Sequence, residues 1–257
     1  MLSPKKSLGQ NFLKDKNIAN KIINLIENYD KKNIIEIGPG KGALTDIIVN
    51  KKPKNLILVE KDKFLFNDLF IKYKNNKSIK IYNDDALEFN LLKIKKPKSI
   101  IANLPYNISI KLIINWLKII YEFDEIILMI QKEVAKKMDY RNTNKMNRLN
   151  ILTSITSNYQ IKFDVSKNVF FPKPKVVSSV IKITPKAKIK YNFSKLEDFT
   201  RILFQYKRKK LKNVLPNEVL KIIKNNGDFY KIKNLLDSRA EDLNIEEIIV
   251  LFKIFSS

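Results

Sequence analysis

The chain has 257 residues, 44% hydrophobic and 30% charged, so it can bury a core, and no apolar run approaches the roughly 18 residues of a membrane span. It contains neither Cys nor His, which excludes disulfides, thiolate metal sites and Ser-His or Cys-His hydrolases, and we expect no metal. Lys and Arg outnumber Asp and Glu by 50 to 26, and the net charge of +24 favours a polyanion such as nucleic acid or an acidic membrane.

Two features qualify that first interpretation. Only five of the basic residues are Arg, and the chain is rich in Lys, Ile and Asn, so an AT-rich codon bias is a second explanation of part of the charge. The stretch before Asp15 has lysines but no apolar core of signal-peptide length. We therefore expect a cytoplasmic protein, with an organellar matrix as the alternative.

The first two thirds of the chain alternate between strand and helix patterns. Apolar residues at helical spacing predict an opening helix over about 17–29. The patterns that follow are strands at 34–37, 56–59, 79–82, 99–102 and 125–130, and helices near 43–50, 62–73 and 108–121. This alternation predicts stacked βαβ units in a doubly wound α/β sheet.

The pattern changes toward the C-terminus. A helix is predicted over 146–157, and two extended runs, 159–165 and 176–183, could pair as an antiparallel hairpin at the sheet edge. After Pro185 only helical patterns follow, at 195–213, 217–225, 231–236 and 245–255. We therefore expect an α/β domain over 1–185 and a small all-helical domain over 186–257.

Three of the five glycines fall in one loop after the first predicted strand. Gly38 and Gly40, with Ala43, fit the G-x-G-x-x-G/A template, in which glycine lets the backbone turn sharply and approach a ligand. A glycine loop alone is a weak signal, and it leaves a nicotinamide dehydrogenase open as an alternative.

Acidic residues mark the ends of three consecutive predicted strands. Glu36 precedes the loop, Glu60 closes the second strand, where a carboxylate can accept both hydroxyls of a ribose, and Asp85 closes the third, where it could face an adenine amino group. One carboxylate for the ribose hydroxyls and another for the adenine amino group favour S-adenosylmethionine as the cofactor.

The tetrapeptide Asn103-Leu104-Pro105-Tyr106 follows the fourth predicted strand, at the edge where α/β sheets bind ligands. An exocyclic amine of a base is a poor nucleophile, because its lone pair is delocalised into the ring. The Asn103 side-chain oxygen and the Leu104 carbonyl could each accept one of its N–H groups, in a bend that proline makes rigid. Tyr106 could stack on the extruded base.

Several segments together resemble one family, the ribosomal RNA adenine dimethyltransferases of the KsgA/Dim type. The resemblance runs in order over about residues 5–215. The segments that carry it are 6–13, 36–45, 60–62, 85–87, 103–109, 131–135 and the Phe-x-Pro-x-Pro-Lys-Val-x-Ser run over 170–178. It implies a Rossmann-like class I methyltransferase domain with a small helical C-terminal domain. It also implies transfer of two methyl groups, each from its own S-adenosylmethionine, to each of two adjacent adenosines near the end of small-subunit ribosomal RNA.

The resemblance also implies roles for individual residues. Gln10, Asn11 and Leu13 would cover the methionine end of the cofactor, and Gly38 and Gly40 would make room for it. Glu60 would hold the ribose, Asp85 the adenine amine, and Asn103 with the Leu104 carbonyl the target amine. Tyr106 and Phe170 would sandwich the base, although the adjacent Phe171 is an alternative to Phe170. The family usually has Gly where this chain has Asp84, so the turn before Asp85 is expected to differ.

A basic run in the tail matches one that the family carries at the start of its helical domain. The resemblance favours an RNA contact for this run, with a solvated helix face as the alternative, and the phosphate contacts would position the protein without reading sequence. The run consists of Lys207, Arg208, Lys209, Lys210 and Lys212.

Rival interpretations stay open at this point. The Erm group methylates an adenine of large-subunit ribosomal RNA, and a non-catalytic RNA-binding relative would share the fold. We expect the small ribosomal subunit as partner, no membrane contact and a monomer.

Overall fold

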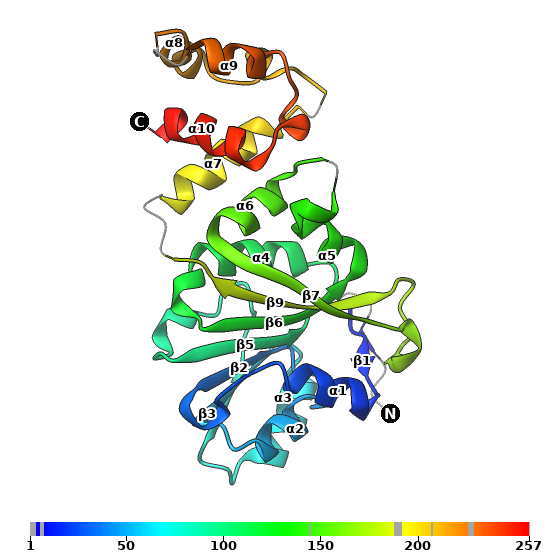
Figure 1. Ribbon diagram of the computed structural model, residues 1–257. Helices are drawn as coiled ribbons and strands as arrows, with labels where there is room; N and C mark the ends of the chain where they lie inside the picture. Colours follow the sequence, from blue (N-terminus) through cyan, green and yellow to red (C-terminus); the bar gives the residue numbers. More distant parts are fainter. Residues whose placement is uncertain are drawn as a thin grey trace. The chain divides into compact units, whose positions relative to one another are not determined.

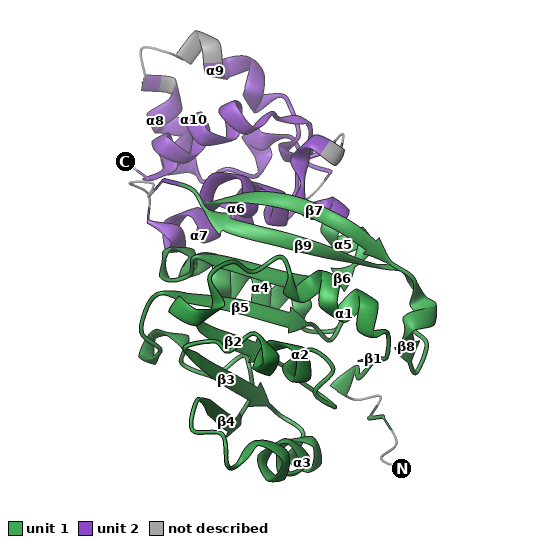
Figure 2. Ribbon diagram, turned by 60° about the horizontal axis from the view of Figure 1, so that its bottom comes forward, with its two compact units in different colours: residues 1–135, 157–186 green, residues 136–156, 187–257 purple. Residues whose placement is uncertain are grey.

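A computed structural model describes residues 4–5, 8–143, 145–187, 192–206, 208–225 and 229–256 (Figure 1). The chain forms two compact units, one made of residues 1–135 and 157–186, the other of 136–156 and 187–257 (Figure 2). The division into domains 1–185 and 186–257 remains a proposal, and it differs from these units in the assignment of 136–156.

The first unit contains a seven-stranded sheet in the order β4-β3-β2-β5-β6-β9-β7. The five strands from β4 to β6 are mutually parallel, and β9 is antiparallel to both of its neighbours. The strands are β2 (Asn33–Ile37), β3 (Asn55–Glu60), β4 (Ile79–Asn83), β5 (Lys98–Asn103), β6 (Glu125–Gln131), β7 (Ser157–Val165) and β9 (Ser178–Pro185). The predicted doubly wound α/β sheet is confirmed, with one reversed strand near its edge.

Helices cover the sheet, which is why the central strands read as continuous apolar runs. All five residues of β2 are buried. On one face, alternate strand residues such as Ile34 and Ile101 form a core with Ile22 and Ile48 from helices α1 and α2. The helices of this unit are α1 (Lys16–Ile23), α2 (Thr45–Asn50), α3 (Lys63–Tyr73) and α4 (Ser109–Lys118), and α5 (Lys132–Met138) begins in it.

Aspartate caps mark the starts of α1 and α3. Asp15 accepts hydrogen bonds from the backbone N–H groups of Asn17 and Ile18, and Asp62 accepts one from that of Phe64. Helix α1 ends at Ile23 and is therefore shorter than the predicted 17–29. The chain then makes a short 3₁₀ turn at Tyr29–Lys31 before β2 begins.

The two late extended runs do pair as an antiparallel hairpin. Strand β7 pairs with β9, with a shift of register between Ile161 and Phe163. The connection between them contains β8 (Phe170–Phe171), which pairs with the short N-terminal strand β1 (Phe12–Leu13). This second, two-stranded sheet brings the N-terminal segment to the hairpin connection.

The second unit is helical. Its helices are α6 (Arg148–Thr156), α7 (Phe193–Leu203), α8 (Asn217–Asn225), α9 (Phe229–Leu236) and α10 (Ile245–Ser256). The predicted helix over 195–213 is wrong beyond Leu203. The backbone of Leu211 instead donates a hydrogen bond to Ser238, and Lys210 forms a β-bridge with Arg239, so long-range backbone contacts replace helical ones.

None of the helices in the described part of the chain is long and apolar enough to cross a membrane.

Candidate active site

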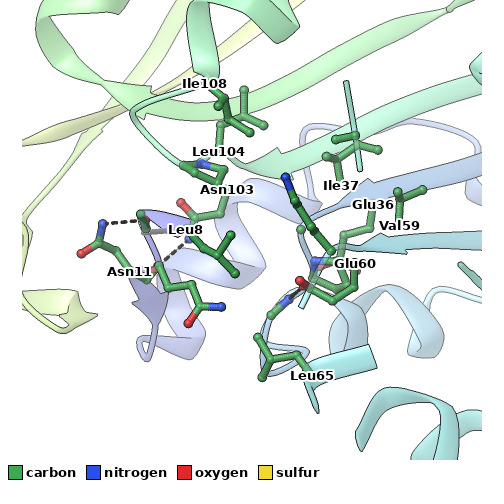
Figure 3. A pocket seen from close by; sticks show the side chains of 18 of the residues that line it. Leu8, Asn11, Glu36, Ile37, Val59, Glu60, Leu65, Asn103, Leu104 and Ile108 are labelled. Atoms are coloured by element: carbon green, nitrogen blue, oxygen red, sulfur yellow. Dashed lines mark hydrogen bonds between the residues drawn. The ribbon is translucent and has the colours of Figure 1, made fainter. Parts of the chain in front are cut away.

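A pocket lies at the carboxyl ends of the parallel strands of the first unit, where open α/β sheets bind ligands (Figure 3). The loops that follow β2, β3, β4 and β5 line it, together with the N-terminal segment 8–13. Figure 3 shows Asn11, Asn103 and Leu104 on one side and Val59 and Glu60 on the other. The sheet therefore brings together segments that lie far apart in the sequence.

The glycine loop needs glycine for two different reasons. Gly38 and Gly40 have φ angles of 65° and 59°, in the left-handed region that favours glycine. A Cβ at Gly40 would lie 3.1 Å from the ring of Phe12, whereas a Cβ at Gly38 would meet nothing within 4 Å. Gly40 thus permits close packing of the N-terminal strand, and the space beside Gly38 remains open within the pocket lining.

Glu60 supports this loop directly. Its buried carboxylate accepts hydrogen bonds from the backbone N–H groups of Gly40, at 2.9 Å, and Asp62, at 2.8 Å. Burial raises the pKa of Glu60, and these two backbone hydrogen bonds oppose the rise. A carboxylate has about four acceptor positions, so capacity for ribose hydroxyls remains beside these two contacts.

Asp85 follows β4 and is held in its ionised form. Lys61 donates to its carboxylate at 2.7 Å, and the backbone of Leu87 donates at 2.9 Å. The hydrogen bond from Lys61 lowers the pKa of Asp85, with the Leu87 N–H as the next cause. Asp84, at the position where the family usually has Gly, accepts a hydrogen bond from the backbone N–H of Asp85 at 2.7 Å.

Glu36 is a third carboxylate in the pocket lining. It is fully buried, and its Oε2 accepts from the Thr45 hydroxyl at 2.7 Å. Desolvation raises the pKa of Glu36 to about 8, against the lowering effect of that hydrogen bond. Neighbouring Glu60 also raises it through charge repulsion.

These residues fit S-adenosylmethionine. The pocket lining includes the carboxylates of Glu60 and Asp85, acceptors of the kind that bind the hydroxyls of a ribose and an exocyclic amine, while buried Glu36 is engaged with Thr45. The glycine loop leaves open space beside Gly38 for close approach of the ligand. The donor and acceptor set of the described lining therefore matches the cofactor that the sequence suggested.

The N-terminal segment is fastened across the pocket. Gln10 donates to Asp62 at 3.0 Å, and Lys5 forms an ion pair of 3.0 Å with the same carboxylate. Leu13 is 6% exposed and belongs to the core, although it also borders the pocket. Sequence reasoning missed Phe12 as a lining residue and Asp62 as the anchor of this segment, although both lie in segments, 6–13 and 60–62, that carry the family resemblance.

Asn103 has its orientation set by a residue 92 positions earlier. Its Nδ2 donates to the backbone carbonyl of Asn11 at 3.0 Å, which leaves its Oδ1 to accept from a ligand. The next backbone N–H, that of Leu104, donates to Met129 in β6 at 3.1 Å and fixes the start of the turn. Among the described residues, no backbone donor bonds to the Leu104 carbonyl, so this second acceptor is also available.

Tyr106 is held at its hydroxyl. This group shares a hydrogen bond of 2.8 Å with Ser178, at the start of β9. Burial raises the pKa of Tyr106, so the phenol stays neutral. Ser178 is the last residue of the Phe-x-Pro-x-Pro-Lys-Val-x-Ser run, and its contact links that run to the tetrapeptide.

The two adjacent phenylalanines differ sharply in exposure. Phe170 is 3% exposed, pairs with Leu13 in register and belongs to the core, while Phe171 is 50% exposed and pairs with Phe12. The Nζ of Lys14 lies 5.5 Å from the centre of the Phe171 ring. The stacking role of Phe170 therefore stays a prediction, and it would require the ring to leave its buried position.

The basic run lies in the second unit, and its residues differ in their partners. Lys210 and Lys212 both form ion pairs with Asp237, at 3.2 and 2.7 Å. The Nζ of Lys209 lies 4.5 Å from the centre of the Tyr206 ring. Arg208 is exposed, and Lys207 lies outside the described residues.

The chain resembles known proteins over its full length. Residues 1–257 match the family model described as ribosomal RNA adenine dimethylase. The chain is 38% identical over 262 residues to ribosomal RNA small subunit methyltransferase A of Wolbachia sp. subsp. Drosophila simulans (strain wRi), covering 98% of this chain and 93% of that protein. It is 43% identical over 220 residues to the protein of that name from Pelagibacter ubique (strain HTCC1062), covering 81% of each.

A solved structure agrees with these sequence matches. A dimethyladenosine transferase from Plasmodium falciparum is similar with a TM-score of 0.76 and 26% identity, covering 93% of this chain and 95% of that one.

Proposed function

Because the chain belongs to the ribosomal RNA adenine dimethylase family, we propose that it dimethylates two adjacent adenosines near the 3′ end of small-subunit ribosomal RNA. Each adenosine receives two methyl groups on its exocyclic amine, and each methyl group comes from a separate S-adenosylmethionine. The names of the relatives from Wolbachia and Pelagibacter support the small subunit as the source of the RNA.

The observation that carries the proposal is the pair of free acceptors after β5. The Asn103 Oδ1 is left free because Nδ2 is bound to Asn11, and the Leu104 carbonyl follows it directly in the chain. Two acceptors that bind the two N–H groups of an amine draw it toward a tetrahedral geometry and release its lone pair from the ring. Such acceptors favour the transition state over the planar ground state, which is what accelerates a reaction.

The remaining residues bind and orient. Glu60 and Asp85 hold the ribose and adenine of the cofactor, and Gln10, Asn11 and Leu13 cover its methionine end. S-adenosylmethionine supplies a methyl group on a sulfonium, an electrophile reactive enough to require no metal and no His base. Tyr106 presents an aromatic ring to the target base, with its hydroxyl fixed by Ser178.

We extend the proposal to partner and place in the cell. The protein acts as a monomer on the small ribosomal subunit or its precursor, in the cytoplasm or an organellar matrix. Arg208 and its basic neighbours bind RNA phosphates.

Transfer of labelled methyl groups tests the proposal. The purified protein is incubated with labelled S-adenosylmethionine and either immature small subunits or large-subunit RNA, and the modified bases are mapped. We expect dimethyladenosine at two adjacent positions of the small-subunit RNA. Label in large-subunit RNA alone would assign the protein to the Erm group, and cofactor binding without label would favour a non-catalytic RNA-binding relative.

A further inference from the structure

A second groove of the first unit lies along the edge strand β4. Its floor is formed by Ile57 of β3 and by Lys80 and Tyr82 of β4. Ile57 is the register partner of Lys80, and residues two apart on a strand share a face, so the three side chains lie on one side of the sheet. Strand β4 is the outermost strand of the sheet (Figure 2). The groove along it therefore lies at the edge of the sheet.

The wall of this groove is built from the segment 84–96. Lys98 is fully buried and donates to the carbonyls of Leu91 and Ile94, at 2.8 and 2.7 Å. Asn33, at the start of β2, donates to another carbonyl of the segment at 2.7 Å. Buried donors therefore hold the wall against the sheet, and the groove is preformed.

Lysines dominate the charge of the groove. Its lysines are Lys54, Lys80, Lys93, Lys95 and Lys96. Two carboxylates, Asp84 and Glu88, also line it. Lys96 is 3.6 Å from Glu122, whereas the other four ammonium groups form no ion pair with any described residue. The groove therefore offers unpaired positive charge to an anion.

An aromatic side chain lies among these lysines. Tyr82 is 41% exposed, and its ring centre is 5.1 Å from that of Phe89, with the planes tilted by 56°. Phe89 supports the ring and leaves part of it accessible. Unpaired lysines beside an accessible aromatic ring are the combination with which proteins bind single-stranded nucleic acid.

We propose that this groove binds an unpaired stretch of the ribosomal RNA substrate, with Tyr82 stacking on a base and Lys80 and Lys93 binding phosphates. The inference rests on the proposed function, because it takes the RNA substrate as the occupant. Asp84 lines both the groove and the cofactor pocket. RNA bound in the groove therefore lies beside the end of the cofactor pocket that Asp85 borders.

Two kinds of variant test the groove separately, with protein-free small-subunit ribosomal RNA as the probe. For Lys80→Gln with Lys93→Gln, we expect the slope of log affinity against log salt to become shallower by about 1.4, roughly 0.7 for each lost phosphate contact on a single strand. For Tyr82→Leu, we expect affinity to fall by about 5- to 150-fold, the range for losing one stacked base, with an unchanged slope. Tyr82→Phe keeps the ring and should keep wild-type affinity.

The matched control removes the same charge elsewhere. Lys21→Gln with Lys118→Gln changes two exposed lysines on α1 and α4, outside the groove, and should alter the slope less than the groove pair does. Binding of S-adenosylmethionine, measured by calorimetry, should equal wild type in every variant and shows that each one is folded. In methyl transfer, the groove variants should raise KM for RNA and leave kcat unchanged.

The possible failures are distinguishable. An equal reduction of the salt slope in the control pair would contradict RNA binding in the groove. An unchanged RNA affinity in Tyr82→Leu would contradict it as well. Weaker binding to the intact subunit with unchanged binding to protein-free RNA would also overturn it and would indicate an acidic protein partner. Absence of methyl transfer by the wild type would contradict the proposed function. The RNA affinities of the variants would still show whether the groove binds RNA.

Discussion

At the scale of single residues, one hydrogen bond decides which atom of Asn103 faces a ligand. An amide side chain has a donor end and an acceptor end, and the Asn11 carbonyl accepts only from the donor end. The acceptor end is thereby assigned to the pocket. The residue type in the tetrapeptide indicates the chemistry, but only the contact with the N-terminal segment gives the side chain its direction.

Asn103→Ala should separate binding from chemistry. The substitution removes an acceptor that acts chiefly as the target amine becomes tetrahedral, so we expect kcat to fall by about 100-fold or more with near-normal affinity for S-adenosylmethionine. Single-turnover methyl transfer and calorimetry measure the two quantities. An equal loss of cofactor affinity and rate would argue that Asn103 chiefly fastens the N-terminal segment.

Glu36 makes stability depend on pH. The pKa of Glu36 is raised to about 8 in the folded protein, whereas it is about 4.3 in the unfolded chain. Below about pH 4.3 the group is protonated in both states, and its burial does not lower the free energy of unfolding. Between about pH 4.3 and pH 8 the unfolded chain releases the proton more readily, so the free energy of unfolding falls as pH rises. Glu36→Gln keeps an oxygen for Thr45 and removes the charge. The variant should therefore become more stable than wild type as pH rises, by at most about 5 kcal/mol at about 1.4 kcal/mol per pKa unit.

Urea unfolding of both proteins without cofactor, from pH 5 to pH 9, measures this difference. The difference in the free energy of unfolding should increase up to about pH 8 and then stay level. A difference that is constant over the whole range would mean that Glu36 is not the group that titrates.

At the scale of elements, the glycine loop and the short strand β1 depend on each other. Gly40 donates its N–H to Glu60, and a Cβ at Gly40 would lie only 3.1 Å from the ring of Phe12. Strand β1 in turn pairs with β8 in the hairpin connection. Three segments that are separated in the sequence are therefore joined, and two of them, the glycine loop and β1, line the pocket.

Gly40→Ala and Gly38→Ala form a matched pair. Both residues have positive φ, so each substitution should cost about 1 kcal/mol in backbone strain. Only the Cβ at position 40 presses on Phe12, so Gly40→Ala should destabilise by roughly 1 kcal/mol more, as overpacking does. Urea midpoints of the cofactor-free proteins compare them, and equal destabilisation would show that Phe12 moves aside freely.

At the scale of the whole molecule, positive charge is present on both units, but it is not equally available. In the second unit, Lys210 and Lys212 share the carboxylate of Asp237, whereas Arg208 has no ion pair with a described residue. Net charge alone does not reveal this difference. The number of phosphates that the run can bind is therefore smaller than its number of basic residues.

Two double variants with the same change in charge test this. Arg208→Gln with Lys209→Gln should make the salt dependence of RNA binding shallower by about 1.4 to 1.8, because both cations are available to phosphates. Lys210→Gln with Lys212→Gln should reduce it by clearly less, because Asp237 already engages both ammonium groups. Equal reductions of the salt dependence would show that RNA displaces Asp237 from the two lysines. An unchanged salt dependence in both variants would show that the run is a solvated surface that does not bind RNA.

Local patterns in the sequence were sufficient for most of the first unit. The strands at 34–37, 56–59, 99–102 and 125–130 were predicted because buried parallel strands are short apolar runs, whatever lies beside them. The run at 79–82 was also predicted as a strand, but β4 is the edge strand, and Lys80 and Tyr82 are exposed. The glycine loop and the tetrapeptide were also readable, because each depends on backbone conformations that few residues adopt. These features determined the fold class and indicated the chemistry.

Tertiary structure decided what depends on contacts between distant residues. It ended α7 at Leu203, because Leu211 bonds to Ser238 instead of continuing a helix that its periodicity allows. It buried Phe170 and exposed Phe171. The two residues are identical and adjacent, so the sequence does not indicate which of them is buried. It turned the acceptor of Asn103 toward the pocket through Asn11. Local propensity contains no information on such pairings, because their partners are brought together only when the sheet and the hairpin have formed.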